Sequence, residues 1–300
     1  MIRTFEEILN KVKCGERKKI AVAVAQDEPV LEAVRDAKNM GLADAVLVGD
    51  KEKIQEIANT LGINLDDFEV IDEKDNAKAA MKAVELVSTK KADMLMKGLI
   101  DTATFLRAVL DKEKGLRTGR VLSHVAVFEV PALQRILLVT DAAMNIAPDL
   151  NTKKQILENA VKVAHAIGIE VPKVAPVCAV EVVNPDMQPT LDAAALSKMN
   201  DRGQIKGCIV DGPLAIDNAL SEEAAKHKGI KSPVAGHADI ILVPNIETGN
   251  VMYKTLTYTA NAKNGGILVG AAAPVILTSR ADSNESKLYS IALACLVACL

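Results

Sequence analysis

Short apolar runs alternate with amphipathic segments over the first third of the chain, and this alternation limits the fold more than any other feature. Lys19–Ala25, Asp44–Gly49 and Asp93–Met96 are rich in Ala, Val, Leu and Met, as is typical of strands buried on both faces. Between them, Glu28–Met40 and Lys51–Leu61 carry apolar residues at helical spacing. Repeated strand–helix–strand order predicts a parallel sheet with helices on both faces, and therefore an α/β fold.

The alternation stops where two strand-like runs follow each other directly. Val121–Val130 and Arg135–Thr140 are separated only by a short segment that contains Pro131. Just before them, Lys112–Gly119 is charged and contains glycine, as is typical of a hinge. We therefore expect a second α/β domain to begin near residue 121.

Composition excludes several classes of function. The chain has 300 residues, a net charge of −3 and only 2% aromatic residues. It therefore lacks the excess of positive charge and the aromatic stacking platforms of a nucleic-acid-binding protein. The last apolar stretch, Leu288–Leu300, is too short to cross a bilayer, so we expect no membrane partner. Neither GxGxxG nor GxxxxGK[ST] occurs, so no motif supports nucleotide-driven hydride or phosphoryl transfer.

The cysteines are scattered and form no CxxC pair. The five positions are Cys14, Cys178, Cys208, Cys295 and Cys299. An odd number of scattered thiols favours a reducing compartment, so we expect the protein in the cytoplasm. Cys295 and Cys299 are four residues apart, but no second ligand pair lies near them in the sequence. We interpret them as small core residues and expect no metal site.

The stretch Ser232–Leu256 predicts a strand, a polar turn and a helix in succession. Ala238–Val243 is apolar and rich in β-branched residues, and Pro244 ends it because proline cannot donate to a central ladder. The turn consists of Asn245, Glu247, Thr248 and Gly249. Asn250 is a suitable N-cap for the helix. Loops after parallel strands lie where α/β proteins bind ligands, and the free N–H groups of a helix start favour an anion. An ordinary βα turn explains the same pattern.

A second polar loop of this kind precedes the last predicted helix, Asn284–Leu300. It places the hydroxyl group of Ser279 beside the guanidinium group of Arg280. Arg280 is able to clamp a phosphate with two hydrogen bonds, and Ser279 to donate to a developing oxyanion. The alternative is that both residues only cap the helix, because Asp282 and Glu285 resemble a capping box.

Two cations in the first part of the chain are further candidates. Lys97 ends a predicted strand, and Gly98 after it permits close approach of the backbone, so the pair is a plausible anion contact. Arg107 lies on the predicted helix Asp101–Leu110. Taken alone, Arg107 is more typical of a solvated surface charge.

Five segments, spread over most of the chain, together resemble the phosphate acetyl/butyryltransferase family. They are LMKG at Leu95–Gly98, DTATFLRAVL at Asp101–Leu110, DGPLAIDNALS at Asp211–Ser221, SPVAGHADIILVPNIETGNVMYK at Ser232–Lys254 and TSRADSNESKLYSIALA at Thr278–Ala294. The last two are the most specific. All five segments occur in the same order as in the family, and a chance coincidence of the last two is remote.

The resemblance implies two α/β domains around a cleft, as in the isocitrate and isopropylmalate dehydrogenases, and a homodimer or higher homo-oligomer. The first domain would comprise residues 1–120 plus 272–300, completed by the C-terminal segment, and the second residues 121–271. The implied reaction converts acyl-CoA and phosphate to acyl phosphate and CoA by direct transfer in a ternary complex. Coenzyme A would be substrate or product, with no tightly bound cofactor.

The family's site residues map onto matching positions of this sequence. Ser279 takes the place of the serine that polarises the acyl carbonyl, and Arg280 that of the adjacent phosphate-binding arginine. Arg107 matches an arginine that faces the cleft. The cleft-lining turn and the helix after it match at Asn245, Thr248, Gly249, Asn250, Tyr253 and Lys254.

Two departures affect the expected chemistry. The acetyl enzymes carry an aspartate, proposed as the base for the CoA thiol, at the position of Ser286, so Glu285 is the remaining candidate base. A further arginine of those enzymes falls near Tyr258. These departures favour the butyryl-type branch. The alternatives are a phosphate acetyltransferase, a metal-dependent dehydrogenase of related fold, for which we find no aspartate cluster, and a non-catalytic sensor of CoA or acyl phosphate.

Overall fold

The computed structural model describes residues 2–278 and 282–300, which divide into two compact units. We call Met1–Thr4 with Val121–Asn264 the central unit, and Phe5–Arg120 with Gly265–Leu300 the terminal unit. The chain returns to the terminal unit at Gly265, whereas we expected the return at residue 272. The reason is that strand β10 (Lys263–Val269) pairs with β11 (Val275–Ile276), and the Ser290 hydroxyl accepts the N–H of Gly266 at 2.9 Å.

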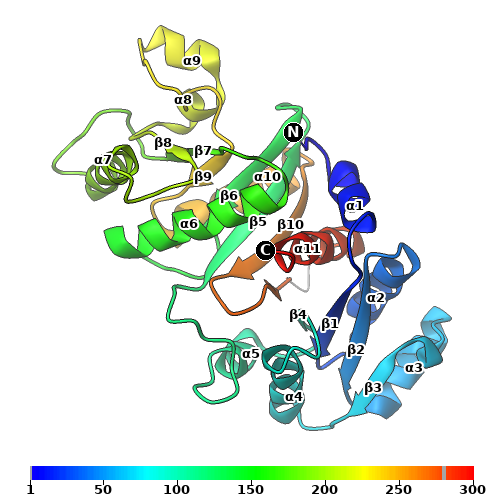
Figure 1. Ribbon diagram of the computed structural model, residues 1–300. Coiled ribbons are helices and arrows are strands. Elements are labelled where there is room, and N and C mark those ends of the chain that lie inside the picture. Colours follow the sequence, from blue (N-terminus) through cyan, green and yellow to red (C-terminus); the bar gives the residue numbers. More distant parts are fainter. Residues whose placement is uncertain (1, 279–281) are drawn as a thin grey trace. The chain divides into compact units, whose positions relative to one another are not determined.

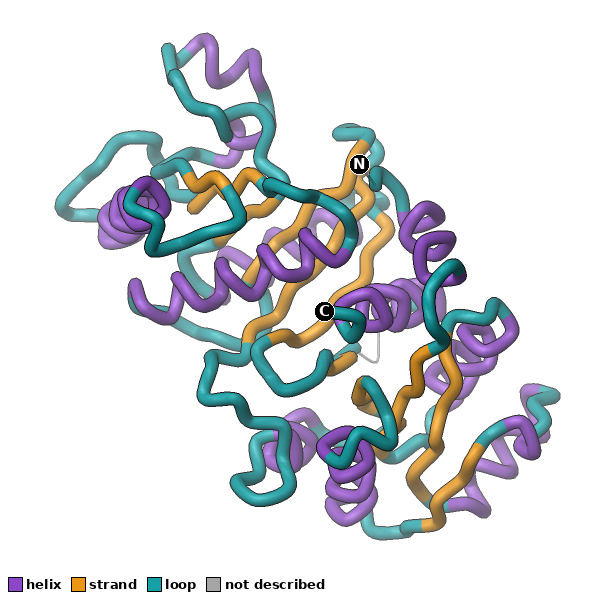
Figure 2. The backbone as a smooth tube through the Cα atoms, viewed as in Figure 1, coloured by secondary structure: helices purple, strands orange, loops and turns teal. Residues whose placement is uncertain are grey.

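The terminal unit is built on a mainly parallel sheet (Figures 1 and 2). Its described strands run in the order β3-β2-β1-β4-β11-β10. The bounds are β1 Lys18–Ala23, β2 Ala43–Gly49, β3 Glu69–Asp72 and β4 Met94–Lys97. Only the β10–β11 pair among these is antiparallel. Because β4 joins β1 on the side away from β2, the gap between β1 and β4 is the topological switch point of this sheet.

Helices cover both faces of this sheet. Their bounds are α1 Phe5–Lys13, α2 Glu28–Asn39, α3 Lys51–Leu61, a 3₁₀ turn at Leu65–Asp67, α4 Asn76–Ser88, α5 Thr102–Val109 and α11 Asn284–Val297. Helix α11 packs against both α1 and α2, and the rings of Phe5 and Tyr289 stack with centroids 4.0 Å apart. Helix α4 packs against β1 and β4 and contacts α5. Asp50, Asp75 and Asp101 cap α3, α4 and α5 by accepting backbone N–H groups.

The central unit contains a mixed sheet with the order β5-β6-β9-β7-β8. The bounds are β5 Ser123–Val130, β6 Arg135–Thr140, β7 Lys173–Pro176, β8 Ile209–Val210 and β9 Ile240–Leu242. Strands β5 and β6 form an antiparallel hairpin, and the other pairs are parallel. The helices are α6 Leu150–Ala166, α7 Gln188–Asp201, α8 Ile216–Leu220, α9 Glu222–His227 and α10 Ile246–Tyr258. The α/β class predicted from the alternation is confirmed.

Alternate residues of the central strands point to opposite faces, and each face has its own helices. Phe128, Val139 and Ile241 belong to a buried cluster against which Met252 and Leu256 of α10 pack. On the opposite face, α6 packs against β5, β6 and β9, as Figure 1 shows for this unit. Both faces are therefore buried, which explains the nearly continuous apolar composition of the strands.

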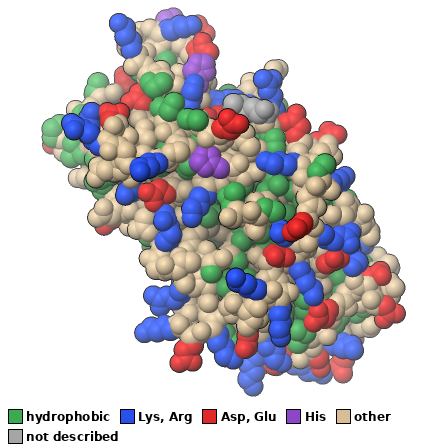
Figure 3. All heavy atoms as spheres, in the orientation of Figure 1, with side chains coloured by type: hydrophobic (Ala, Val, Ile, Leu, Met, Phe, Trp, Pro, Cys, Tyr) green, Lys and Arg blue, Asp and Glu red, His purple; other side chains and the backbone are tan. Residues whose placement is uncertain are grey.

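Charged side chains of both signs are intermingled over most of the face seen in Figure 3. No helix within residues 2–278 or 282–300 is both long enough and apolar enough to pass through a membrane.

A buried ion pair joins α6 to α7 in the central unit. Lys153 Nζ lies 2.6 Å from Asp192 Oδ2, and the two side chains are 6% and 9% exposed. Gln188 donates from Nε2 to the other oxygen, Asp192 Oδ1, at 2.9 Å. Both carboxylate oxygens therefore have partners, which offsets the cost of removing these charges from water.

Replacing one partner of this pair should cost stability. Lys153→Met leaves the Asp192 carboxylate buried without its counter-ion, so the free energy of unfolding in urea should fall by about 3 kcal/mol. The double variant Lys153→Met/Asp192→Leu should recover most of this loss. Lys198→Met, which breaks the exposed Lys198–Asp201 pair, is the control and should cost less than about 1 kcal/mol. An unchanged Lys153→Met protein would contradict the assignment.

Candidate functional site

The central unit places the predicted polar turn directly after β9, at the carboxyl end of the strand. Asn245 is the N-cap of α10: its backbone is extended, and its side-chain oxygen accepts the N–H of Thr248 at 3.0 Å. The prediction that Asn250 caps this helix is therefore wrong, and Asn250 lies inside the first turns. Several residues of this stretch are able to cap a helix, and the earliest of them does so.

The start of α10 offers an anion fewer N–H groups than we expected. The N–H of Ile246 donates to the Ile146 carbonyl at 3.0 Å, and the N–H of Thr248 is used by the cap. The N–H of Gly249 donates to the Asn245 carbonyl at 3.2 Å. Among the predicted site residues of this turn and helix, Thr248, Asn250 and Lys254 are the ones with exposed side chains.

Gly249 is required by packing within the central unit. A Cβ at this position would lie 2.7 Å from the Asp141 carbonyl oxygen and 2.9 Å from Ala142 Cα. These are backbone atoms that cannot swing away, so any side chain would push α10 off the loop that follows β6. Gly249 therefore shapes the turn without itself presenting a functional group.

Tyr253 turns toward the core of the central unit. Its hydroxyl donates to Asn264 Oδ1 at 3.0 Å, and its ring packs edge-on against Phe128 and His124 with centroids 5.2 and 6.1 Å apart. These contacts hold α10 on the sheet. A direct contact of Tyr253 with substrate remains a prediction.

The terminal unit places Lys97 and Gly98 at the carboxyl end of β4. Lys97 is 7% exposed, and its Nζ donates to the Gly98 carbonyl at 3.4 Å. The N–H of Gly98 donates to the Ala23 carbonyl at 2.8 Å, and a Cβ on Gly98 would meet the Val24 carbonyl oxygen at 2.1 Å. Gly98 therefore lets the loop after β4 close on the end of β1, which fixes the backbone at the switch point.

Arg107 lies on the exposed side of α5. Its Nη2 donates to Thr104 Oγ1 at 2.8 Å. Asp101 caps the same helix by accepting the N–H of Thr104 at 2.8 Å. Hydrogen bonds from Thr104, and to a lesser extent the Arg107 charge, lower the pKa of Asp101. The guanidinium thus remains on the surface, where the neutral hydroxyl of Thr104 accepts one of its hydrogen bonds.

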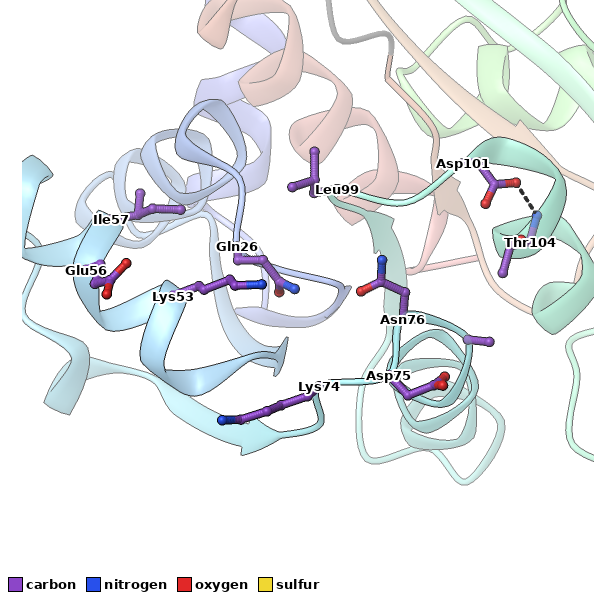
Figure 4. Close-up of a pocket in the computed structure, with 11 residues that line it drawn as sticks. Gln26, Lys53, Glu56, Ile57, Lys74, Asp75, Asn76, Leu99, Asp101 and Thr104 are labelled. Atoms are coloured by element: carbon purple, nitrogen blue, oxygen red, sulfur yellow. Dashed lines mark hydrogen bonds between the residues drawn. The ribbon is translucent and has the colours of Figure 1, made fainter.

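A pocket of about 850 Å³ lies at the carboxyl ends of β1 to β4 in the terminal unit (Figure 4). Its lining residues are Gln26, Lys53, Glu56, Ile57, Lys74, Asp75, Asn76, Ala77, Leu99, Asp101 and Thr104. Gln26 is 7% exposed, and its Oε1 accepts the N–H of Asp50 at 3.3 Å. None of the predicted site residues lines this pocket. Its members lie on the loops after β1, β3 and β4 and at the starts of α3, α4 and α5, and only their position after strands would have signalled them.

The last helix begins differently from the prediction. Ser283 is the N-cap of α11 and accepts the N–H of Ser286 at 3.1 Å, so Asp282 and Glu285 do not form the expected capping box. Glu285 is exposed, and its Oε1 accepts the hydroxyl of Tyr289 at 2.6 Å. Ser286, at the position of the expected aspartate, is buried.

The predicted site residues thus form separate groups. Asn245, Thr248, Gly249 and Asn250 are brought together at the start of α10, and Lys97 lies next to Gly98 at the end of β4. Ser279 and Arg280 lie outside the described residues. Among residues 2–278 and 282–300, no group of three or more His, Cys, Asp or Glu side chains is placed to hold a metal ion.

Comparison with known proteins gives relatives that match the chain over nearly its full length. Phosphate butyryltransferase of Clostridium acetobutylicum is 69% identical over 99% of both chains. The crystal structure of a branched-chain phosphotransacylase from Enterococcus faecalis V583 is 37% identical, with a TM-score of 0.83 over 94% of this chain and 99% of that one. A 4-hydroxythreonine-4-phosphate dehydrogenase from Klebsiella pneumoniae shares the fold alone, with a TM-score of 0.60, 11% identity and coverage of 94% and 100%.

The sequence also matches a protein family as a whole, and this match assigns the chain to that family. Residues 3–81 and 73–295 match the family described as phosphate acetyl/butaryl transferase. This span includes all five segments on which the resemblance rested. The dehydrogenase-like fold that the resemblance implied is confirmed by the structural similarity. The chain is an acyltransferase and belongs to the phosphate acetyl/butyryltransferase family.

Proposed function

We propose that this protein transfers a butyryl group, or a similar short or branched acyl group, between coenzyme A and inorganic phosphate. The observation that carries the proposal is the 69% identity, over 99% of both chains, to a protein named phosphate butyryltransferase. The replacement of the expected aspartate by Ser286 supports the butyryl-type branch. A phosphate acetyltransferase is the second candidate, because the matched family includes acetyl enzymes by its description.

The reaction sets clear chemical requirements. It needs a cationic site for phosphate, donors for the oxyanion of a tetrahedral intermediate, and an apolar surface for the acyl chain. We assign phosphate binding to Arg280 and oxyanion stabilisation to Ser279. The exposed Arg107 and the side chains of Asn250 and Lys254 are assigned to substrate binding, because they are solvent-accessible polar groups on α5 and α10.

Proton transfer matters in only one direction. When acyl phosphate is consumed, the CoA thiol, with an ordinary pKa of about 8.5, must lose a proton, whereas phosphate is already anionic in the opposite direction. Glu285 is our candidate base. The support for this assignment is that Glu285 is exposed and that the hydrogen bond from the Tyr289 hydroxyl orients its carboxylate.

Direct transfer requires no protein thiol, and the cysteines fit this requirement. Burial raises the pKa of Cys178 and of Cys208 to about 11, and that of Cys295 to about 12. Such thiols are protonated at neutral pH and are poor nucleophiles. The described cysteines are free, which supports a reducing compartment, the cytoplasm. We further propose that the enzyme holds no tight cofactor and works as a homodimer or higher oligomer.

Thiol chemistry tests the absence of a covalent acyl-enzyme. A disulfide reagent at pH 8 should label the exposed Cys14 and Cys299 quickly, and the buried Cys208 and Cys295 only after urea is added. Intact mass after incubation with butyryl-CoA without phosphate should show no butyryl adduct. Cys14→Ser, the control, should remove one rapidly labelled thiol. A stoichiometric adduct on a cysteine would contradict direct transfer.

The activity itself has a simple assay. Butyryl-CoA and phosphate together should release free CoA thiol, and omission of phosphate should abolish the release. The same assay with acetyl-CoA compares kcat/KM for the acetyl group with that for the butyryl group. Tight CoA binding without turnover would instead identify a sensor, and an NAD-dependent absorbance change would identify a dehydrogenase.

Two substitutions test the assigned roles. Arg280→Ala should raise the KM for phosphate strongly, because it removes the cation that holds phosphate. Ser279→Ala should lower kcat by up to about 10²-fold, the scale of losing one oxyanion donor. Arg202→Ala, at the exposed end of α7, is the control and should behave as wild type. Unchanged kinetics in the first two variants would reject the assignment.

A further inference from the structure

The loop that follows β6 is organised around one buried carboxylate. Asp141 is 2% exposed, and its Oδ1 accepts the N–H groups of Ala143 and Met144 at 2.9 and 3.0 Å. Its Oδ2 accepts the N–H of Asn145 at 3.2 Å and the Asn145 side-chain amide at 2.6 Å. Four donors thus converge on one side chain, and each would lose this acceptor if the carboxylate were removed.

The same network ties the loop to the neighbouring strand. Asn145 Nδ2 also donates to the Leu122 carbonyl at 3.0 Å, just before β5. The loop is therefore fixed at its start by Asp141 and at its end by Asn145. Neither residue was singled out from the sequence, because nothing in the local pattern distinguishes this loop from an ordinary strand-end turn.

This loop contacts the strand–turn–helix segment that begins with β9 at three points, all within the central unit. The N–H of Val243 donates to the Thr140 carbonyl at 2.8 Å, and the N–H of Ile246 donates to the Ile146 carbonyl at 3.0 Å. At the third point, Gly249 packs against the backbone of Asp141 so closely that a Cβ would not fit. The position of the turn that contains Asn245 is thus set by the last residue of β6, Thr140, and by the loop that Asp141 holds.

We propose that Asp141 is a positioning residue for the acyl-transfer reaction, acting through the loop 141–146 on the start of α10. The inference rests on the proposed function, since it takes Asn245–Asn250 to be part of the substrate-binding surface. Asp141 does not need to touch the substrate. A misplacement of about 1 Å in a binding surface is enough to cost on the order of 10²-fold in rate, so loosening this loop affects substrate binding.

The chemistry of the network requires a carboxylate at this position. An ionised carboxylate only accepts hydrogen bonds, whereas an amide of the same shape carries two N–H donors. In Asp141→Asn, one of the two oxygens becomes an NH₂ group that faces the backbone N–H and the side-chain amide of Asn145, or the N–H groups of Ala143 and Met144. Either orientation sets donors against donors and displaces the loop.

Steady-state kinetics of the full-length enzyme test the proposal. Asp141→Asn should raise the KM for butyryl-CoA or for phosphate by about tenfold, with a smaller change in kcat, because binding and not chemistry is disturbed. The double variant Asp141→Asn/Asn145→Ala removes one of the opposed donors and should recover part of the lost affinity. Ile136→Val, at the other end of β6, is the control: it destabilises a buried site by about 1 kcal/mol and should leave both KM values unchanged.

The outcomes separate this inference from the proposed function. If wild type releases thiol in a phosphate-dependent way but Asp141→Asn has the kinetics of Ile136→Val, the positioning role is overturned and the proposed function stands. If wild type shows no such activity, the proposed function fails first. Should Asp141→Asn not fold, Gly249→Ala decides. It leaves the carboxylate network intact but pushes α10 off the loop, so it should raise the same KM, and an unchanged KM would overturn the proposal.

Discussion

The parallel pairing of β6 with β9 is the constraint on which the central unit's candidate site depends. Leu138, Val139 and Thr140 pair with Ile240, Ile241 and Leu242. This register ends both strands at the same level, so the loops that follow them must leave the sheet side by side. The Asp141 network and the Asn245 cap are therefore neighbours because of backbone pairing, and a slip of one residue would separate them and turn the side chains of β9 that face α10 toward α6.

The terminal unit uses the same principle with different chemistry. There β4 lies beside β1 in parallel, with Leu95 opposite Ala21 and Lys97 opposite Ala23. Gly98 then folds onto the end of β1 with no room for a side chain. Around this closure, the N-caps of α3, α4 and α5 leave their carboxylates near the strand ends, and the pocket that contains Gln26 opens beside them. Ligand-accessible space thus lies at the sheet's switch point, as doubly wound architectures lead one to expect.

The pattern of apolar residues predicted helices and strands well where it followed one spacing, either that of a helix or that of a strand. The strand Arg135–Thr140 was predicted with the bounds that the structure has, because β-branched residues fill it and Pro131 sets it apart from the run before. The sequence pattern of residues 214–226 is typical of one helix, but the structure has two, α8 and α9. Ser221 separates the two helices, because its hydroxyl accepts the N–H of Ala224 and caps a new helix. This side-chain hydrogen bond competes with continuation of the first helix.

The limits of prediction at the candidate site have a physical origin. Asn245 and Asn250 are equally good caps by residue type, and the structure uses Asn245, beside which the N–H of Ile246 donates to the Ile146 carbonyl. Asp141 carries no motif, because its four donors come from backbone and amide groups that converge only after folding. The antiparallel pairing of β10 with β11 was also not predicted. The residues that connect the two strands resemble any apolar turn, and the strands can be identified only from the strands with which they pair in the folded sheet.

The order in which the elements of the terminal unit occur along the chain has a consequence for synthesis. Strand β11 completes the terminal sheet by pairing with β4, with Val275 opposite Leu95, and Tyr289 stacks on Phe5 from the first helix. The ribosome therefore releases these partners of the earliest elements only after the whole central unit. The central unit, continuous from Val121 to Asn264 apart from its first few residues, emerges complete while the other waits. Vectorial synthesis thus leaves the opening βα units with an unpaired β4 edge until the whole central unit and β11 have been made.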